Sequence, residues 1–578
     1  MTEQEYLQQI HELEKQVLRL QTELKKNSET QYGLRWMDVP EAFEAEAENA
    51  IPTLEEVPDK AITNDDGKPT HILIEGDNFH ALTCLNYTHK GQIDVIYIDP
   101  PYNTGSDGFV YKDKRVLDKF PDGTTVPADH PLRHSYWLSF MHKRLELAKN
   151  LLSERGVIFI SIDDNEQANL KLLCNQVFGE KNFIAQIIWE RAYAPVNLKK
   201  HFSESHDYML CYANNIEKAV CNGLPRTEEA NSKYKNPDND PRGLWRTDNL
   251  AVGPRVEAQV YEITTPSGRK VWPPEGYCWR LTKERFEEYV KDNRIWFGEN
   301  GDLVPAPKRF MSEVKDSMTP MTIWKYSEVG HSQDAMRALR DIFGGQVLFS
   351  YPKSLSLIER VIRLYSSSTS TILDFFGGSG TTMHATMQLN EEDGGHRQCI
   401  LVQQNENNIC EAVTYERNKR VMQGYTNAKG EAVAGLGNSM KYYRTAFVGE
   451  HKITDFTDAD KVALTQKAGC LLALGENNLE EIKTAKSYQI FQLRKGDKPT
   501  NDFGYTAVYF SGNLSHFADF RREIEQIQAA NPLTRIAVYV FTWGDPSVFE
   551  NEFDDLSGIT IKPIPQPILE IYQNIHQL

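Results

Sequence analysis

The chain has 578 residues, which is too long for one compact core and indicates three or four structural units. Its content of 40% hydrophobic and 25% charged residues is ordinary for a soluble globular protein. No run approaches the roughly 18 apolar residues of a membrane span, and the acidic, polar segment Met1–Glu5 is unlike a secretory signal. We therefore expect a cytoplasmic protein with no membrane partner.

The charges are unevenly distributed along a chain whose net charge is −17. Nine acidic residues and one basic residue lie between positions 41 and 66, whereas the segment 191–330 is close to neutral. Charge alone therefore does not predict DNA as a partner. The eight cysteines are scattered without a Cys-x-x-Cys pair, which argues against a zinc site and a disulfide framework and fits a reducing cytoplasm.

The first predicted element is a helix within residues 1–30. Apolar side chains over 4–27 recur at alternating spacings of four and three, which is the a/d pattern of a coiled coil. Three heptads are short, so a helix packed on its own chain is an equal alternative. The acidic, proline-containing segment 31–69 is predicted to be an irregular arm.

Strands then alternate with helices over residues 70–190. The strand candidates are His71–Ile74, Gln92–Ile98 and Gly156–Ile162, and residues 136–154 have helical periodicity. Alternation of this kind predicts a parallel, doubly wound α/β sheet.

The alternation stops between residues 191 and 345, a segment rich in Pro, Gly, Trp, Tyr and Arg, and resumes with strands at 370–373 and 399–402. We therefore predict that the segment 191–345 is an insert in the α/β domain, which continues over 346–444. Strand candidates at 505–510 and 536–542 indicate a separate C-terminal α+β unit over 445–578.

The strand at 92–98 ends in Asp99-Pro100-Pro101-Tyr102. Two consecutive prolines fix φ and remove two N–H donors, which leaves a stiff loop with free carbonyls. Such a loop can present the Asp99 carboxylate and the Pro100 carbonyl to one amino group, with Tyr102 as a stacking surface. The exocyclic amino group of a base has two N–H donors beside a π-face, so it matches all three. The alternative is an ordinary strand-ending turn, which this rare string at a strand end disfavours.

A second strand ends in the loop Asp374–Thr382, which contains Gly377, Gly378 and Gly380. Glycines allow a backbone to approach a ligand closely, because a Cβ atom would collide with it. The loop lacks the Gly-Lys-Ser/Thr of a phosphate-binding Walker loop and the Gly-x-Gly-x-x-Gly spacing of dinucleotide folds. Together with the first loop, it predicts a cofactor site of another kind.

The two loops resemble motifs IV and I of the amino-methyltransferases of DNA, and their order, with a long insert between them, resembles the β arrangement of that superfamily. Pro352–Leu355 resembles motif X, which lines the methionine end of the cofactor. The similarity covers most of residues 70–410 and is closest to the modification (Mod) subunit of type III restriction-modification systems. The segments that carry it are Asp99–Lys112, Trp137–Asn165, Phe178–Phe183, Asp240–Arg246, Arg294–Gly298, Val329–His331 and Asn390–Arg397.

This resemblance implies a Rossmann-like sheet of the S-adenosylmethionine-dependent methyltransferase type, with S-adenosyl-L-methionine as cofactor. It implies transfer of a methyl group to N6 of an adenine flipped out of double-stranded DNA. The implied catalytic residues are Asp99, Pro100, Pro101 and Tyr102. The implied cofactor-binding residues are Lys353, Asp374, Phe375, Phe376, Gly377, Gly378, Gly380, Thr381, Thr382 and Glu406. Glu406 is the candidate ribose ligand, because Gln403 and Gln404 stand where an acid is expected.

Other chemistries have weaker support in the sequence. His201 and His206 lack a third ligand, so no metal site is expected. No cysteine follows a proline, which disfavours methylation of cytosine C5 through a cysteine nucleophile.

The insert 191–345 is the expected target-recognition domain, because it interrupts the catalytic fold without adding to its sheet. Its candidate DNA-binding residues are Arg242, Arg246, Arg255, Arg269 and Lys270, with solvated surface charges as the alternative reading. The resemblance further implies a homodimer and a restriction (Res) helicase-nuclease subunit as partner.

Three alternatives remain open at this point. The first is a solitary adenine methyltransferase with no restriction partner. The second is an N4-cytosine methyltransferase, which Asp rather than Ser at position 99 disfavours by resemblance. The third is a non-catalytic DNA-binding specificity subunit, which the two intact loops disfavour.

Overall fold

A computed structural model describes residues 34–39, 41, 50–104, 113–120, 123–127, 130–195, 200–449, 451, 455–512, 514–543 and 546–576. The predicted N-terminal helix over 1–30 lies outside these residues. The chain forms two compact units, one of Met1–Cys221 with Thr322–Leu578 and one of Asn222–Met321. The separately packed part of the chain is thus narrower than the predicted insert 191–345. The expectation that this insert adds nothing to the sheet is wrong, because its strands His206–Ala213 and Ile323–Trp324 belong to the large sheet.

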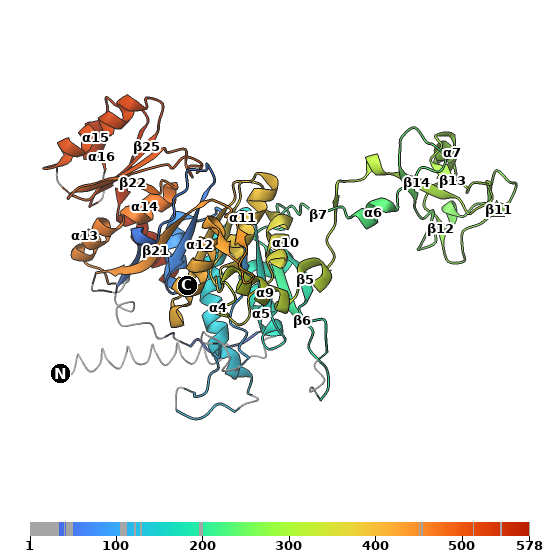
Figure 1. Cartoon of the computed structure of the whole chain (residues 1–578), viewed down its shortest axis with the longest axis horizontal. Helices are drawn as coiled ribbons and strands as arrows, with labels where there is room; N and C mark the ends of the chain where they lie inside the picture. The colour runs from blue at the N-terminus through green and yellow to red at the C-terminus, as the bar shows by residue number, and fades with distance from the viewer. Residues whose placement is uncertain are drawn as a thin grey trace, which may run out of the picture. The chain divides into compact units, whose positions relative to one another are not determined.

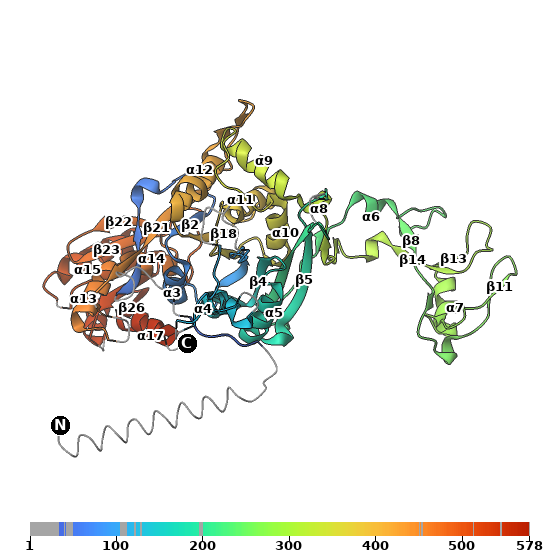
Figure 2. The same ribbon diagram turned by 90° about the horizontal axis from the view of Figure 1, so that it is seen from below.

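The larger unit is built on one ten-stranded sheet (Figures 1 and 2). Its spatial order is β1 (Ile51–Glu56), β21 (Ser439–Val448), β2 (Thr70–Glu75), β18 (Gln398–Gln403), β17 (Thr371–Asp374), β3 (Ile93–Ile98), β4 (Leu152–Ile162), β6 (His206–Ala213), β5 (Phe183–Glu190) and β16 (Ile323–Trp324). The strands from β21 to β4 are mutually parallel, whereas β1 and β6 run antiparallel to their neighbours. The predicted doubly wound α/β sheet is confirmed.

Alternate residues of the buried strands enter two different cores, as the period of two in a strand requires. In β2, Ile72 and Ile74 pack into one core and Leu73 into the other. The first core contains α3 (Asn78–Thr88), α4 (Ser135–Leu151) and α5 (Gln167–Cys174). The second contains α9 (Ser332–Ile342), α11 (Thr381–Asp393) and α12 (Glu416–Gln423). Two further helices, α8 (Tyr326–Val329) and α10 (Leu355–Tyr365), pack on each other, and β19 (Tyr425–Thr426) pairs with β20 (Ala432–Val433).

The predicted irregular arm 31–69 contains β1, which pairs with β21 at the edge of the large sheet. Ile51, Thr53 and Leu54 are buried there. The acidic and proline-rich composition of the surrounding segment concealed this short strand, because an edge strand tolerates Pro52 and the flanking carboxylates.

The C-terminal part carries a second sheet of five strands, β22 (Glu480–Thr484), β23 (Tyr488–Gln492), β24 (Tyr505–Tyr509), β25 (Ile536–Phe541) and β26 (Ile559–Ile564). The strand candidates at 505–510 and 536–542 correspond to β24 and β25. The helices are α13 (Asp458–Lys467), α14 (Gly469–Glu476), α15 (Phe517–Ala530), α16 (Ser547–Glu550) and α17 (Gln566–His576). Both α14 and α17 pack on α3, so the core of the large sheet continues into this part (Figure 2). No helix in the described residues is long and apolar enough to cross a membrane.

The unit Asn222–Met321 consists of short elements around a small apolar core. Its strands are β7 (Leu224–Pro225), β8 (Trp245–Thr247), β9 (Ala251–Val252), β10 (Ile263–Thr264), β11 (Lys270–Val271), β12 (Cys278–Trp279), β13 (Ile295–Trp296), β14 (Ala306–Phe310) and β15 (Ser317–Met318). Its helices are α6 (Glu228–Ser232) and α7 (Lys283–Lys291). The core consists of Leu250, Ile263, Val271, Trp279, Phe286 and Ile295.

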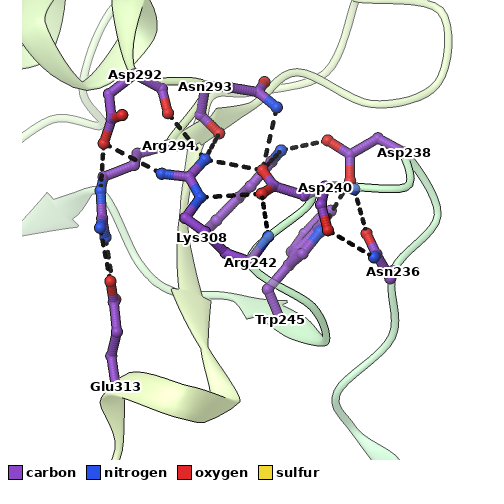
Figure 3. Close-up of polar contacts among 10 residues, drawn as sticks. All are labelled: Asn236, Asp238, Asp240, Arg242, Trp245, Asp292, Asn293, Arg294, Lys308 and Glu313. Atoms are coloured by element: carbon purple, nitrogen blue, oxygen red, sulfur yellow. Dashed lines mark hydrogen bonds and ion pairs between the residues drawn. The ribbon is translucent and has the colours of Figure 1, made fainter.

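The unit also contains a network of charged side chains around the buried Lys308 and Asp240 (Figure 3). Lys308 has a fully buried side chain and binds the carboxylates of Asp238 and Asp240. Arg242 donates to both oxygens of Asp240, at 2.9 and 2.8 Å, and also binds Asp292 at 3.1 Å. Unpaired buried charges are costly, so each member of this network depends on the others.

We expect Asp240→Asn to destabilise this unit. The Arg242 guanidinium holds the pKa of the Asp240 carboxyl well below its ordinary range. Because the pKa is lowered on folding, the stabilisation is present above about pH 4 and is lost as the pH falls below that value. At neutral pH the substitution should cost about 3 kcal/mol, measured by hydrogen exchange of peptides from Asn222–Met321 in increasing denaturant.

The matched control is Asp316→Asn, because the side chain of Asp316 is exposed. It should leave the exchange of the same peptides unchanged. Equal exchange in the wild type and the Asp240→Asn variant would contradict the structural role of the network.

Candidate functional site

The site lies where the strand order of the large sheet reverses. β17 and β3 are adjacent and parallel, with Ile372 opposite Val95 and Leu373 opposite Ile96. The other neighbour of β17 is β18 and that of β3 is β4. Asp374 ends β17 and Asp99 follows β3, so both loops emerge at the same edge. In open α/β sheets the carboxyl ends of strands at such a reversal form a ligand-binding crevice.

A cavity with about 950 Å³ of empty space, partly open to solvent, occupies this position. The predicted site residues that line it are Asp99, Pro101, Lys353, Asp374, Phe375, Phe376, Gly377, Gly378, Thr381, Thr382 and Glu406. Pro100, Tyr102 and Gly380 do not line it. Pro352 and Ser379, which belong to the predicted motif X segment and cofactor loop, also line it. Lining residues that were not predicted are Asp77, Asn78, Tyr97, Arg115, Phe140, Phe349, Tyr351, Gln403, Gln404 and Ile409.

Both oxygens of the Asp99 carboxylate are engaged. The Tyr102 hydroxyl donates to Oδ1 at 2.7 Å, and the Lys353 ammonium binds Oδ2 at 2.5 Å. Lys353 also lies 5.1 Å from the centroid of the Tyr102 ring. The predicted cofactor residue Lys353 therefore contacts the predicted catalytic residues directly.

The double-proline loop is anchored through its second proline and through Tyr102, whose N–H donates to Oδ1 of Asp113 at 3.0 Å. The indole Nε1 of the fully buried Trp137 donates to the Pro101 carbonyl at 2.7 Å. Among the residues that the structure describes, no hydrogen-bond donor contacts the Pro100 carbonyl. The loop thus holds Asp99 and Tyr102 in place and leaves one acceptor available beside them.

The glycine loop is held by hydrogen bonds at both ends. The N–H of Gly378 donates to Oε1 of Gln403 at 2.6 Å, and the Thr382 hydroxyl donates to Oδ2 of Asp374 at 2.5 Å. The Phe376 N–H donates to Oδ1 of Asp374 at 3.0 Å. Asp374 is only 2% exposed, and burial raises its pKa to about 7. The loop therefore carries a carboxyl group that titrates near neutrality at the wall of the cavity.

Buried arginines from distant segments support these loops. Arg417 donates to the hydroxyls of Ser379 at 3.1 Å and Thr381 at 2.7 Å, and burial lowers its pKa to about 9. Arg144 donates to Oδ1 of Asn78 at 2.5 Å, and Asn78 in turn donates to the Phe375 carbonyl at 2.8 Å. No local sequence signal identified either arginine, because each acts on a loop far away in the chain.

Glu406 begins a short 3-10 turn, Glu406–Asn408, and lines the cavity after β18 together with Gln403 and Gln404. Its role as a ribose ligand stays a prediction. Among the described residues there is no group of three His, Cys, Asp or Glu side chains arranged to hold a metal ion.

Most of the predicted DNA-binding residues are engaged within the unit Asn222–Met321. Arg242 belongs to the charge network, Arg255 pairs with Glu257 at 2.8 Å, and Lys270 pairs with Glu262 at 2.9 Å. Arg269 donates to the Asp302 carbonyl at 3.0 Å. Arg246 is different, because no carboxylate pairs with it in the described part of the chain. Contact of these five residues with DNA stays a prediction.

The sheet and the crevice define an α/β protein with a candidate ligand site where the strand order reverses. A sequence profile described as DNA methylase matches residues 93–426. Because this match covers more than half of the chain, the protein belongs to that DNA methylase family.

Three curated relatives are similar to this chain. The type III restriction-modification enzyme StyLTI Mod subunit of Salmonella typhimurium is 38% identical over 352 residues, which are 58% of this chain and 53% of that protein. The EcoPI Mod subunit of Escherichia phage P1 is 32% identical over 384 residues, 58% of each protein. The type II methyltransferase M.KpnI of Klebsiella pneumoniae is 30% identical over 396 residues, 64% of this chain and 90% of that protein. The chain thus spans between half and three fifths of the Mod subunits that it matches.

We expect Gly380→Ala to be more damaging to the fold than Gly378→Ala. Both glycines have positive φ, which costs other residues about 1–2 kcal/mol. A Cβ atom at Gly380 would lie 2.4 Å from Asn418 Nδ2 and 3.1 Å from the Thr414 carbonyl. At Gly378 its nearest neighbour would be Phe349 Cζ at 3.6 Å.

Denaturant unfolding should show a loss of about 3 kcal/mol for Gly380→Ala and about 1 kcal/mol for Gly378→Ala. The two variants are matched controls, because they share the loop and the backbone strain. Equal losses would mean that the close packing of Gly380 against α12 is unimportant.

Proposed function

We propose that this chain is a site-specific DNA methyltransferase that transfers a methyl group from S-adenosyl-L-methionine to N6 of an adenine in double-stranded DNA. The observation that carries this proposal is that Asp99 and the glycine loop Asp374–Thr382 line one cavity. Membership of the DNA methylase family and the similarity to Mod subunits support the same reaction.

The residues of the cavity fit the cofactor. Gly377 and Gly378 place backbone without side chains against the cavity, which suits close approach of a bulky ligand. Glu406 and Gln404 offer polar side chains for hydroxyl groups. Asp374 offers a carboxylate to the cationic methionine end. When bound, S-adenosyl-L-methionine supplies an electrophilic methyl group on a sulfonium.

The remaining chemistry belongs to the loop after β3. A target base inside a duplex must be flipped out of the stack, at a cost of a few kcal/mol. Tyr102 provides the flat ring for stacking the flipped adenine. The Pro100 carbonyl accepts one N6–H, and Asp99 accepts the other when the amino group replaces the Tyr102 hydroxyl or the Lys353 ammonium at its carboxylate.

These two acceptors draw the N6 lone pair out of conjugation with the ring and direct it at the methyl group. The bound cofactor would supply the methyl group to N6, with its sulfonium sulfur as the leaving group. Asp99 would pass the surplus N6 proton to solvent, since its side chain is 25% exposed. Catalysis then rests on orientation and electrostatics, without a covalent enzyme intermediate.

The protein is further proposed to act as the modification and specificity subunit of a type III restriction-modification system, in the cytoplasm, as a homodimer with a restriction (Res) subunit as partner. The Mod subunits among its relatives support this assignment. The unit Asn222–Met321 is the proposed target-recognition domain. A second candidate is a methyltransferase that acts without a restriction subunit, which the 90% coverage of M.KpnI favours.

The Asp99→Ala variant should lose methyl transfer while it keeps cofactor binding. We expect a fall in the rate of at least about 100-fold, as for loss of one preorganised polar contact in an active site. The measurement is transfer of label from S-adenosyl-L-methionine to unmethylated DNA, followed by identification of the modified nucleoside. Calorimetric cofactor binding is the control, and turnover retained in the variant would refute the role of Asp99.

Cofactor binding should strengthen as the pH rises through about 7. Burial holds the pKa of Asp374 near that value, so the carboxyl is protonated below it and ionised above it. A cationic ligand stabilises the ionised form, so its affinity should rise by up to about tenfold per pH unit below 7 and level off above. Calorimetric titrations across this range measure the effect.

Two variants test the assignment of this pH dependence. Asp374→Asn should bind the cofactor weakly and independently of pH. Thr382→Val removes the hydroxyl that lowers the pKa of Asp374, so the midpoint should move to higher pH. A wild-type profile that is flat across neutrality would contradict the proximity of Asp374 to the cation.

A further inference from the structure

Two arginines face each other across the strand pair β8–β14 of the unit Asn222–Met321. In the antiparallel register Arg246 lies opposite Arg309, and Trp245 lies opposite Phe310. Trp245 and Phe310 are 3% and 0% exposed and form the inner face of the pair. Because side chains alternate along a strand, Arg246 and Arg309 share the outer face. Arg309 is exposed there.

A third arginine and an aromatic ring extend this face. Lys235 exchanges two backbone hydrogen bonds with Trp245, both of 2.8 Å, which brings Tyr234 beside Arg246. The guanidinium carbon of Arg246 lies 5.5 Å from the centroid of the Tyr234 ring, and that of Arg226 lies 5.2 Å from it. We call Arg226, Arg246 and Arg309 the arginine surface.

In the part of the chain that the structure describes, the three members of the arginine surface form no ion pair. The unit contains 16 Lys and Arg against 16 Asp and Glu, so it could pair its charges completely. Five other arginines of the unit are paired with carboxylates, namely Arg242, Arg255, Arg280, Arg285 and Arg294. Within the described residues, no ion pair involves any member of the arginine surface. The side chain of Arg226 instead donates to Asn231 Oδ1 at 2.8 Å.

Two details make this lack of partners informative. Like charges directly opposite each other on neighbouring strands destabilise a sheet, yet Arg246 and Arg309 occupy such a pair. The Nε of Arg246 is buried and has no hydrogen-bond partner among the described residues. Asp248 is an acidic neighbour of Arg309, but its carboxylate is already bound by Arg280 at 3.0 Å. No carboxylate of the described residues is therefore paired with these guanidinium groups.

We propose that the arginine surface binds the phosphate backbone of duplex DNA. This inference rests on the proposed function and specifies the surface by which the recognition unit holds its substrate. Guanidinium groups form paired, charge-assisted hydrogen bonds with phosphate oxygens, and Arg309 is accessible to them. Arg242 would first have to leave Asp240 (Figure 3). Arg255 would likewise have to leave Glu257, so both contribute less.

The test is Arg309→Ala in the full chain, because its exposed side chain makes no hydrogen bond or ion pair among the described residues. The probe is a fluorescently labelled duplex of random sequence, with affinity measured by anisotropy over a range of salt concentrations. We expect about tenfold weaker binding and a salt slope smaller by about one, as for loss of one phosphate contact. Arg226→Ala should show the same effect.

The matched control is Arg285→Ala, which removes an exposed but ion-paired arginine of the same unit. Its affinity should stay within about twofold of the wild type, because it releases no phosphate contact. Wild-type affinity and salt slope in Arg309→Ala would overturn the proposal. A second result would also overturn it, namely a loss of affinity in Arg309→Ala that is seen only with duplexes containing the recognition sequence, once that sequence is mapped. Such a loss indicates contact with a base edge.

The readouts separate this inference from the proposed function. If Arg309→Ala binds DNA weakly but methylates at the wild-type rate when DNA is saturating, both stand. If the wild type binds DNA through Arg309 but transfers no methyl group, the surface stands and the proposed reaction fails. If methyl transfer is intact and DNA affinity does not depend on Arg309, the surface alone fails.

Discussion

The site depends on the adjacency of β3 and β17. These strands are separated by more than 270 residues in the chain, yet they pair in parallel with Ile372 opposite Val95. Parallel strands deliver their carboxyl ends to one edge of the sheet, so the loops after Ile98 and Asp374 must meet. The two loops come from distant parts of the chain, and only the register of this strand pair turns them into one cavity.

The contact between Lys353 and Asp99 follows from the same arrangement. Resemblance placed Lys353 at the methionine end of the cofactor site, and the structure places its ammonium 2.5 Å from the Asp99 carboxylate. A residue that touches the catalytic loop and also lines the cofactor cavity links the two halves of the proposed reaction. In the proposed reaction, binding of the adenine therefore changes the polar surroundings of the cofactor, because the incoming amino group replaces Tyr102 or Lys353 at the Asp99 carboxylate.

The sequence predicted those parts of the site whose chemistry is local. Asp99 directly follows a strand and Asp374 ends one, each within a recognisable string, so their position at the sheet edge followed from strand periodicity alone. Arg144 and Arg417 could not be predicted, because a buried arginine that supports a distant loop has no signature in its own segment. The strand β1 was missed for a related reason, since its acidic, proline-containing surroundings are also typical of an irregular arm.

The glycines of the loop Asp374–Thr382 show the same limit of prediction from sequence. Gly377, Gly378 and Gly380 were all assigned to close approach of a ligand, and the first two line the cavity. Gly380 does not, and a Cβ there would collide with Asn418 on α12. The pattern correctly indicated that a side chain is excluded, but only packing shows what excludes it.

The charge of the unit Asn222–Met321 shows the same limit of prediction from sequence. A net charge of −17 argues against DNA as a partner, and the equal numbers of acids and bases in Asn222–Met321 do not reverse that argument. The electrostatic potential near a bound phosphate is set by protein charges that are not already paired. The charges of an ion pair cancel within a few ångströms, and charges farther away are screened beyond about 10 Å. Arg242 is paired with the carboxylate of Asp240, whereas Arg309 lies on an outer face and has no ion pair within the described residues. The distribution of ion pairs, which a count of residues does not show, therefore determines which surface of an acidic protein can bind the phosphates of DNA.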